Sequence, residues 1–208
     1  MSLINNLQWR YATKKMNGES VTNEKLQAIL DAIQLAPSSY GLQPYTVFVI
    51  SDPEVKAKLQ PASYGQTQIV DGSHIIVFAS WTDVSAQQVD DYMTNIASKR
   101  NMPIEALNGF KDYINGSIAN LSQEQKAAWN AKQSYIALGI GLAAAAEQQV
   151  DATPMEGFVP AQYNEILGLT QQGLHASVVM ALGYRAETDA LATMPKVRRD
   201  KDLLFKFI

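Results

Sequence analysis

Cysteine is absent from this 208-residue chain, and histidine occurs only twice, as His74 and His175. Without thiols the chain cannot form disulfides, cysteine nucleophiles, iron–sulfur clusters or cysteine-based zinc sites. Its histidines and carboxylates show no metal-ligand spacing, so we expect no metal site. The motif G-x-S-x-G is also missing, and both histidines adjoin apolar runs, as structural histidines do. The sequence therefore favours chemistry carried by a bound cofactor, which protein groups position and polarise.

Glycine-rich phosphate motifs are missing as well. Neither G-x-G-x-x-G nor G-x-x-x-x-G-K-[ST] follows an apolar run, which excludes a Rossmann-type dinucleotide site and a P-loop. Any bound phosphate must then be held by cations that are scattered along the chain. The sequence offers Arg10 with Lys14, Lys196 with Arg198, and Lys132. Each of these alone has the pattern of a solvated surface charge.

Charge and hydropathy describe a globular protein without a nucleic-acid or membrane surface. The net charge is −3 and 47% of the residues are hydrophobic, so no nucleic-acid footprint is expected. The N-terminus lacks the charged start and apolar run of a signal peptide. The longest weakly polar stretch, Tyr135 to Ala146, is shorter than the about 20 residues that span a bilayer. A cytoplasmic location is predicted.

Apolar periodicity predicts one domain over residues 1–208, in which helices and strands are mixed. Helices are expected over 3–11, 22–36, 53–59, 85–101, 123–149 and 160–167, and buried strands over 46–51, 75–79 and 176–184. Thr22 is expected to cap the second of these helices, whose apolar positions, Leu35 among them, are expected to face the core, and Pro53 is expected in the first turn of the third. Residues 153–158 are expected to form a tight loop. The middle of the 123–149 helix is apolar on every face, which suggests that a second subunit supplies part of its cover.

Three further segments have patterns that leave their roles open. Residues 36–45 form a rigid loop rich in proline, serine and glycine, which suits either a ligand-binding loop or an ordinary connection. Residues 102–125 are weakly patterned and contain Asn-Gly pairs, which suits either a cap or lid insertion or poorly packed surface helices. The apolar end, 203–208, could add a strand to a neighbouring subunit.

Five segments in order resemble the nitroreductase family of FMN-dependent NAD(P)H oxidoreductases, and the resemblance covers nearly the whole chain. They are residues 10–14 (RYATK), 36–39 (APSS) together with 43–45 (QPY), 129–133 (WNAKQ), 154–158 (PMEGF) and 195–198 (PKVR). The resemblance implies an α+β fold with a mainly antiparallel central sheet flanked by helices. It also implies an intertwined homodimer that holds FMN at the subunit interface.

Positively charged residues in the matched segments are similar to the family's FMN ligands. Arg10, Lys196 and Arg198 resemble the family's grip on the FMN phosphate, and Lys14 resembles the cation near the pyrimidine edge of the flavin. Gln133 resembles a contact to the ribityl chain. Tyr11 and Ala12 stand where the family often has histidine and serine, so their contacts would come from the backbone.

The remaining implied contacts surround the flavin ring. Gln66 and Gln68 fall in the segment that supplies the flavin O2, N3 and O4 edge, and glutamine can both donate and accept there. The segment Pro154, Met155, Glu156 and Gly157 resembles the loop over the flavin face, with a backbone N–H near Gly157 bonded to N5. The loop residues Pro37, Ser38 and Ser39 would reach the FMN of the other subunit. Phe110 and Tyr113 are candidates for the acceptor side.

The implied reaction is ping-pong hydride transfer from NAD(P)H through FMN to nitroaromatic or quinone-type acceptors. NAD(P)H is the co-substrate, and no residue pattern selects NADH over NADPH. The alternatives are a flavin reductase and a non-catalytic flavin-binding redox module of the same fold.

Overall fold

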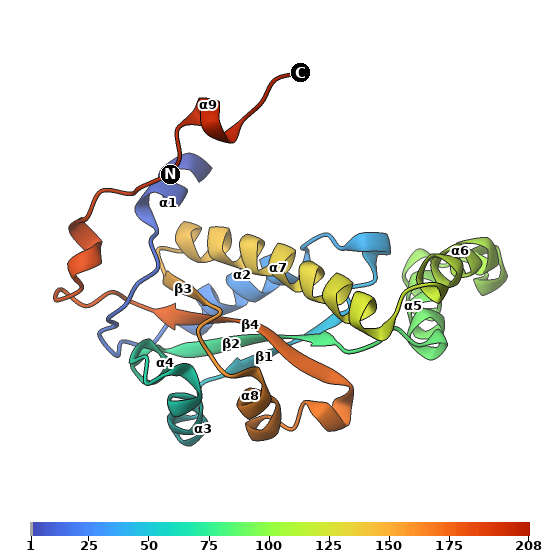
Figure 1. Ribbon diagram of the computed structural model, residues 1–208, viewed down its shortest axis with the longest axis horizontal. Coiled ribbons are helices and arrows are strands. Elements are labelled where there is room, and N and C mark those ends of the chain that lie inside the picture. The colour runs from blue at the N-terminus through green and yellow to red at the C-terminus, as the bar shows by residue number, and fades with distance from the viewer. Residues whose placement is uncertain (1) are drawn as a thin grey trace.

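A four-stranded antiparallel sheet forms the centre of the computed structural model, which describes residues 2–208 (Figure 1). The strands are β1 (Tyr45–Ile50), β2 (His74–Trp81), β3 (Asp151–Met155) and β4 (Leu174–Gly183), in the order β1-β2-β4-β3. All three neighbouring pairs are antiparallel. The antiparallel sheet that the family resemblance implied is therefore confirmed.

Two strand predictions need correction. Strand β3 occupies part of the segment that was expected to be a loop. Pairing with β4, in which Thr153 lies opposite Ala181, makes this segment a strand, although its local sequence shows no strand pattern. Its Pro154 is tolerated because β3 is an edge strand. Strand β1 lies at the other edge, and Val49 is 41% exposed. A continuous apolar run therefore gave the correct element but the wrong burial.

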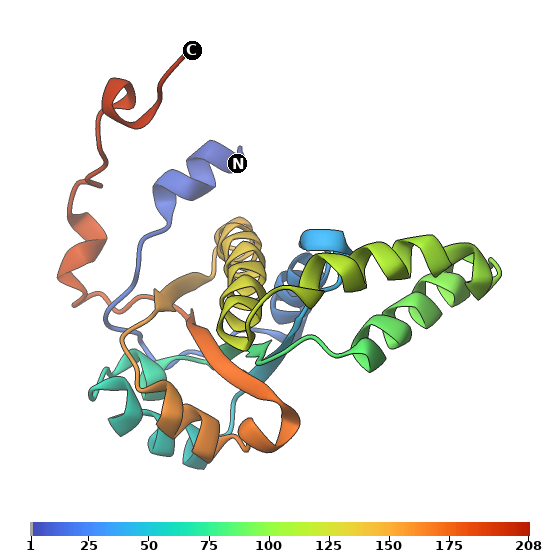
Figure 2. The same ribbon diagram turned by 45° about the vertical axis from the view of Figure 1, so that its right-hand side comes forward.

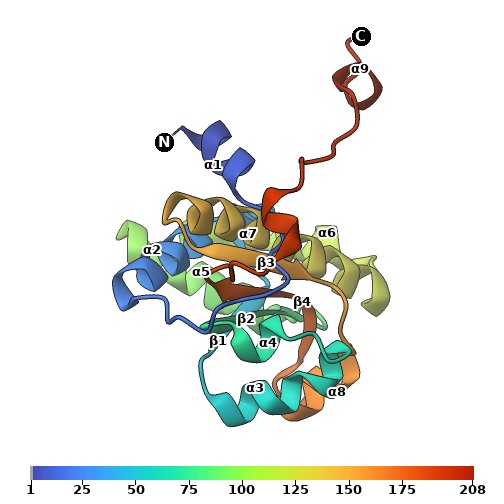
Figure 3. The same cartoon turned by 90° about the vertical axis from the view of Figure 1, so that its left-hand side faces the viewer.

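Helices cover both faces of the sheet (Figure 3). One face, with Ile76 and Met180, packs against α2 (Asn23–Gln34) and α7 (Gln123–Glu147). The other face, with Ile75 and Val179, packs against α3 (Pro53–Leu59), α4 (Gln68–Asp71) and α8 (Pro160–Ile166). Successive side chains of a strand point to opposite faces, so the continuous apolar run of β2 serves both layers.

Helices α5 (Ala86–Arg100) and α6 (Asn108–Ala119) form an arm that extends from the sheet (Figure 2). The arm has its own apolar cluster, in which Val89 and Ile114 are fully buried. One of the two alternatives for residues 102–125 was poorly packed surface helices. The buried cluster shows that this alternative is wrong for the face of α6 that packs against α5. The Asn-Gly pairs lie inside α6 and do not interrupt it. A role as a cap or lid stays a prediction.

Several apolar side chains have no cover within residues 2–208. On α1 (Leu3–Trp9), Leu3 and Ile4 are about 60% exposed, and on α7 Ile136 and Ile140 are 42% and 38% exposed. Leu35, which the helical pattern directed into the core, is 82% exposed. Residues 191–208, including α9 (Lys201–Leu204), are exposed, and their end extends away from the sheet (Figure 1).

Candidate cofactor-binding site

A cavity of about 430 Å³ lies between the segment after α1 and the segment before α9. The two segments are far apart in the sequence, and β3 adds Pro154 between them. The lining residues include seven that the sequence analysis selected: Arg10, Tyr11, Ala12, Lys14, Pro154, Lys196 and Arg198. The folded chain thus brings together four of the five dispersed cations, whereas Lys132 does not line this cavity.

Three of these cations repel one another. Burial, and then the charge of Arg198, lower the pKa of Arg10 below its usual value. Burial lowers the pKa of Lys196, and Arg10 and Arg198 lower it further. Among residues 2–208, no carboxylate lies within ion-pair distance of these three cations. Arg10 Nε is buried and has no hydrogen-bond partner within residues 2–208. Such a cluster has the donors and the charge to bind an anion.

Asp189 ties the two cation-bearing segments together. Its buried carboxylate accepts hydrogen bonds from Lys14 N–H at 2.7 Å, Lys15 N–H at 3.2 Å, Leu191 N–H at 3.1 Å and the Tyr11 hydroxyl at 3.1 Å. Burial acts to raise the pKa of Asp189, but these hydrogen bonds together hold it below its usual value. The charged carboxylate therefore sets the position of the cavity walls.

Asp151 organises the neighbouring backbone. It forms an ion pair with Arg185, with 2.6 Å between Oδ1 and Nη2, and accepts a hydrogen bond from Thr13 Oγ1 at 3.2 Å. The Arg185 guanidinium in turn stacks over the rings of Trp9 and Tyr11, 4.3 and 4.7 Å from their centroids. The residues on both sides of Arg10 are thereby fixed.

The Asp189→Asn variant is expected to unfold with a free energy about 1–3 kcal/mol lower at pH 7, because an amide replaces a carboxylate that accepts several N–H groups. The folded-state pKa is depressed, so the carboxylate stabilises the wild type above the ordinary value of about 3.9, and this contribution is lost as the pH falls through the folded value. Urea unfolding at pH 7 and near pH 3 should show a smaller acid-induced loss in the variant.

The exposed Asp200, whose side chain makes no capping hydrogen bond, provides the control. Asp200→Asn should leave both the stability and its pH dependence unchanged. A pH dependence in Asp189→Asn equal to that of the wild type would contradict the anchoring role of Asp189.

The loop after β3 begins just beyond Pro154, which lines this cavity. Tyr135 on α7 donates to Glu156 Oε1 at 2.6 Å, and Gln66 Nε2 donates to Gly157 O at 2.7 Å. Gln66 Oε1 accepts from Gln68 Nε2 at 3.0 Å. The structure thus places Gln66 and Gln68 beside the loop, with their amides bonded to protein groups.

A second group of predicted residues lies outside the cationic cavity. Ser39 N–H donates to Gln133 Oε1 at 2.8 Å, and Ser38 Oγ accepts from Gln43 N–H at 2.8 Å. Gln133 is 3% exposed and also donates to Trp129 O. None of these residues lines the cavity around Arg10. Ser38, Ser39 and Gln133 therefore form one unit in the fold, separate from the cations.

The acceptor-side candidates belong with this second group. On α6, the Tyr113 ring packs edge-on against Tyr40 at a centroid distance of 5.9 Å, and Tyr40 contacts Trp129 at 6.0 Å. Phe110 packs against the apolar cluster of the arm. The arm therefore meets the 36–45 loop through Tyr40, which the sequence analysis did not select.

A model of the nitroreductase family matches residues 7–184. The chain belongs to the nitroreductase family. It is 32% identical to a protein of Thermus thermophilus named NADH dehydrogenase, over 86% of this chain and 84% of that protein. It is 28% identical to the major NAD(P)H-flavin oxidoreductase of Aliivibrio fischeri, over 95% of this chain and 94% of that protein.

Solved structures of other nitroreductases share the fold. One from Exiguobacterium sibiricum, described as a nitroreductase in complex with FMN, has a TM-score of 0.84 and 21% identity. The match covers all of this chain and 98% of that one. At this identity the likeness establishes the fold, and the family model establishes membership.

Three residues that contact predicted site residues were not themselves predicted from the sequence: Tyr40, Tyr135 and Asp189. Tyr40 stands next to the predicted Ser39, and its positive φ of 59° is uncommon for a residue other than glycine. Tyr135 and Asp189 act through partners distant in the sequence, so no local pattern marks them.

In residues 2–208 no group of three histidines or carboxylates is arranged to hold a metal ion. Within the same residues, no helix has the length and hydropathy to cross a membrane.

Proposed function

We propose that this chain is an FMN-dependent NAD(P)H oxidoreductase that transfers hydride from NAD(P)H through FMN to nitroaromatic or quinone-type acceptors. The observation that carries the proposal is the group of three cations at the cavity, which repel one another and have no carboxylate of residues 2–208 within ion-pair distance. In an acidic chain with net charge −3, such an arrangement is most simply explained as a seat for a dianionic phosphate.

The residues at this cavity fit FMN. The buried Arg10 Nε, to which residues 2–208 offer no acceptor, and the exposed Arg198 guanidinium supply fork-shaped donors, which match phosphate oxygens. Lys196 adds a third positive charge, although its Nζ also donates to Leu7 O and Arg10 O. The volume of about 430 Å³ falls within the range of small-molecule sites.

Bound FMN supplies the two-electron chemistry, accepting a hydride from NAD(P)H and delivering it to the acceptor. The protein's own part is to bind and to orient. Lys14 lines the cavity as a positive charge, and its backbone is fixed by Asp189. The exposed Gly157 offers an N–H that no group among residues 2–208 accepts. NAD(P)H and acceptor are proposed to occupy one site in turn.

A homodimer is part of this proposal. Ser38, Ser39 and Gln133 form a unit outside the cationic cavity, and in the proposed dimer this unit of one subunit contacts the FMN that the cations of the other subunit hold. The uncovered faces of α1 and α7 supply apolar surface for the interface. A cytoplasmic location stays a prediction of the sequence.

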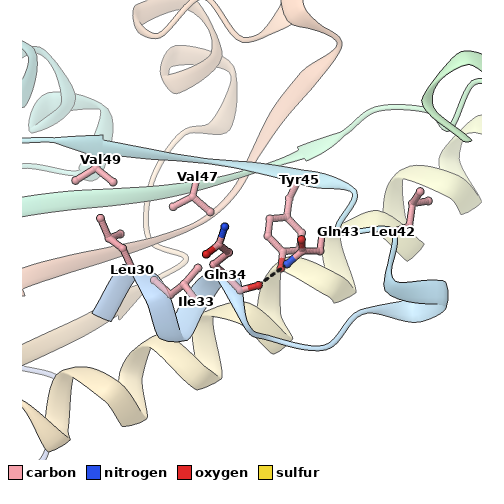
Figure 4. Close-up of a pocket in the computed structure, with 8 residues that line it drawn as sticks. All are labelled: Leu30, Ile33, Gln34, Leu42, Gln43, Tyr45, Val47 and Val49. Atoms are coloured by element: carbon pink, nitrogen blue, oxygen red, sulfur yellow. Dashed lines mark hydrogen bonds between the residues drawn. The ribbon is translucent and has the colours of Figure 1, made fainter. Parts of the chain in front are cut away.

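An apolar groove offers a place for the partner's C-terminal end. It lies between α2 and β1, is lined by Leu30, Val47 and Val49, and has a volume of about 440 Å³ (Figure 4). At one end of the groove, Gln43 Nε2 donates to Gln34 O at 2.8 Å. Strand β1 is an edge strand, so its outer backbone groups are free to pair. The exposed apolar residues of 203–208 suit this position.

The aromatic contact of Tyr113 with Tyr40, beside Ser39, supports an acceptor site completed by the arm of one subunit. Flat acceptors such as nitroaromatics and quinones suit aromatic walls. The name of the Aliivibrio fischeri relative makes free flavin the second acceptor to test.

The purified protein is expected to bind FMN, and NADH or NADPH should then bleach the flavin absorption near 450 nm. Addition of a nitroaromatic, a quinone or free flavin in the absence of oxygen should restore the colour and identify the acceptor. Steady-state rates that give parallel double-reciprocal lines would support ping-pong order. Protein that gains no flavin on addition of FMN would refute the proposal, and bound flavin that neither nicotinamide reduces would favour a non-catalytic redox module.

A further inference from the structure

Two elements hold the loop between β3 and α8. Tyr135, on α7, donates its hydroxyl hydrogen to Glu156 Oε1 at 2.6 Å. Gln66, just before α4, donates to the carbonyl of the next residue, Gly157, at 2.7 Å. Consecutive loop residues are therefore fixed by side chains that lie far from each other in the sequence.

The glutamine side of this clamp is itself fixed. Gln66 Nε2 also donates to Ser63 O at 3.1 Å, and its Oε1 accepts from the buried Gln68 at 3.0 Å. A Cβ atom at position 157 would lie 3.1 Å from Gln66 Nε2. Glycine at this position thus permits the close approach of the amide. The loop at Gly157 and the side-chain amide of Gln66 are therefore in close contact.

The tyrosine side is a charge-assisted hydrogen bond. Burial, together with the Glu156 carboxylate, raises the pKa of Tyr135 to about 12. The phenol therefore keeps its proton and acts as a donor at neutral pH. Charge-assisted O–H···O⁻ bonds are short and about twice as strong as neutral ones. Removal of the hydroxyl should free the Glu156 side chain while Gln66 still holds the carbonyl of Gly157.

The Gly157 N–H lies between these two attachments. No acceptor for it exists among residues 2–208, and Gly157 is exposed. The peptide that carries this N–H joins Glu156 to Gly157, so its direction depends on how both residues are held. A donor held in a fixed direction loses less entropy when it binds an acceptor.

We propose that Tyr135 is a positioning residue that, by holding Glu156, directs the Gly157 N–H toward N5 of bound FMN. The inference rests on the proposed function. Tyr135 neither transfers a proton nor contacts the reacting atoms in this role. It acts only through the carboxylate of Glu156, and Gln66 supplies the second point of attachment.

The test is the nitrogen resonance of N5 in ¹⁵N-labelled oxidised FMN bound to each protein. A hydrogen bond to N5 moves this resonance upfield, so Tyr135→Phe should move it downfield. The FMN dissociation constant should rise by less than about tenfold, since one hydrogen bond is weakened. Glu156→Ala should reproduce the downfield shift, whereas Glu156→Gln keeps a carbonyl acceptor and should retain most of the wild-type position.

Tyr64→Phe is the matched control, because Tyr64 is 71% exposed and its hydroxyl makes no hydrogen bond to residues 2–208. It should leave the N5 resonance unchanged. Bound FMN with the same N5 resonance in wild type, Tyr135→Phe and Glu156→Ala would overturn the positioning role alone. A wild-type protein that does not bind FMN would overturn the proposed function, and this inference with it.

Discussion

Replacing Arg10 by alanine is expected to raise the FMN dissociation constant by about 10- to 150-fold, as measured by fluorescence titration. This range corresponds to about 1.5–3 kcal/mol for a hydrogen bond to a charged group. Arg10 belongs near the upper end because it is partly buried and its Nε has no partner in the described part of the chain, residues 2–208. Arg10→Lys keeps the charge but loses the fork-shaped donors, so it should lie between alanine and the wild type.

The same substitution should not destabilise the FMN-free protein. In that state Arg10, Lys196 and Arg198 repel one another, and burial of Arg10 carries a desolvation cost. Removal of the Arg10 charge relieves the repulsion and the desolvation cost and gives up only a weaker attraction to Asp151. We therefore expect the free energy of unfolding without FMN to stay equal or to rise. Removal of a residue that only supports the fold would lower the free energy of unfolding, so an equal or higher value would identify Arg10 as a residue that serves binding at the expense of stability.

A neighbouring arginine provides the control for the cation cluster. Arg198 lines the cavity, whereas Arg199 donates to Leu203 O outside it. Arg198→Ala should weaken FMN binding, and Arg199→Ala should leave it unchanged. FMN affinity that is unaltered in both Arg10→Ala and Arg198→Ala would place the phosphate elsewhere.

Local sequence signals predicted most elements because those elements depend on neighbours in the chain. Thr22 was expected to cap a helix, and its hydroxyl accepts from Lys25 N–H at the start of α2. Pro53 was expected in the first turn of a helix and occupies that position in α3. Strand β3 was missed because pairing with β4 specifies it, and Leu35 was misplaced because α2 ends just before it.

The role of the cavity-lining cations as FMN ligands stays a prediction of the sequence, and their geometry could not be predicted from it. The matched segments identified Arg10, Lys196 and Arg198, but nothing local indicated that they line one cavity. Their meeting depends on long-range contacts, above all the hydrogen bonds of Asp189 to Lys14 and Lys15. The separation of Gln133 from this cavity was equally hidden, since its partner Ser39 is also distant in sequence.

The uncovered face of α7 leads to the second large effect. Ile136 and Ile140 lie one helical turn apart and are 42% and 38% exposed, and the nearby Gly139 also lies open. Changing both isoleucines to glutamate would place four carboxylates at the proposed two-fold interface, because each subunit of a two-fold dimer contributes the same patch. We expect the dimer dissociation constant to rise by roughly a thousandfold or more, at about 1–2 kcal/mol for each buried charge.

The effect of the substitutions on FMN binding distinguishes the proposed interface from an apolar surface that only causes association. If Ser38, Ser39 and Gln133 complete the site of the other subunit, the monomeric variant should lose FMN although its own cations are intact. Ile104→Glu, on the α5–α6 arm with 44% exposure, is the control and should remain dimeric and flavin-bound. Size-exclusion chromatography with light-scattering and visible-absorbance detection measures the mass of each species and its bound flavin together. A monomer that retains FMN at wild-type affinity would show that one chain holds the whole site, and the two separate groups of residues would then need another explanation.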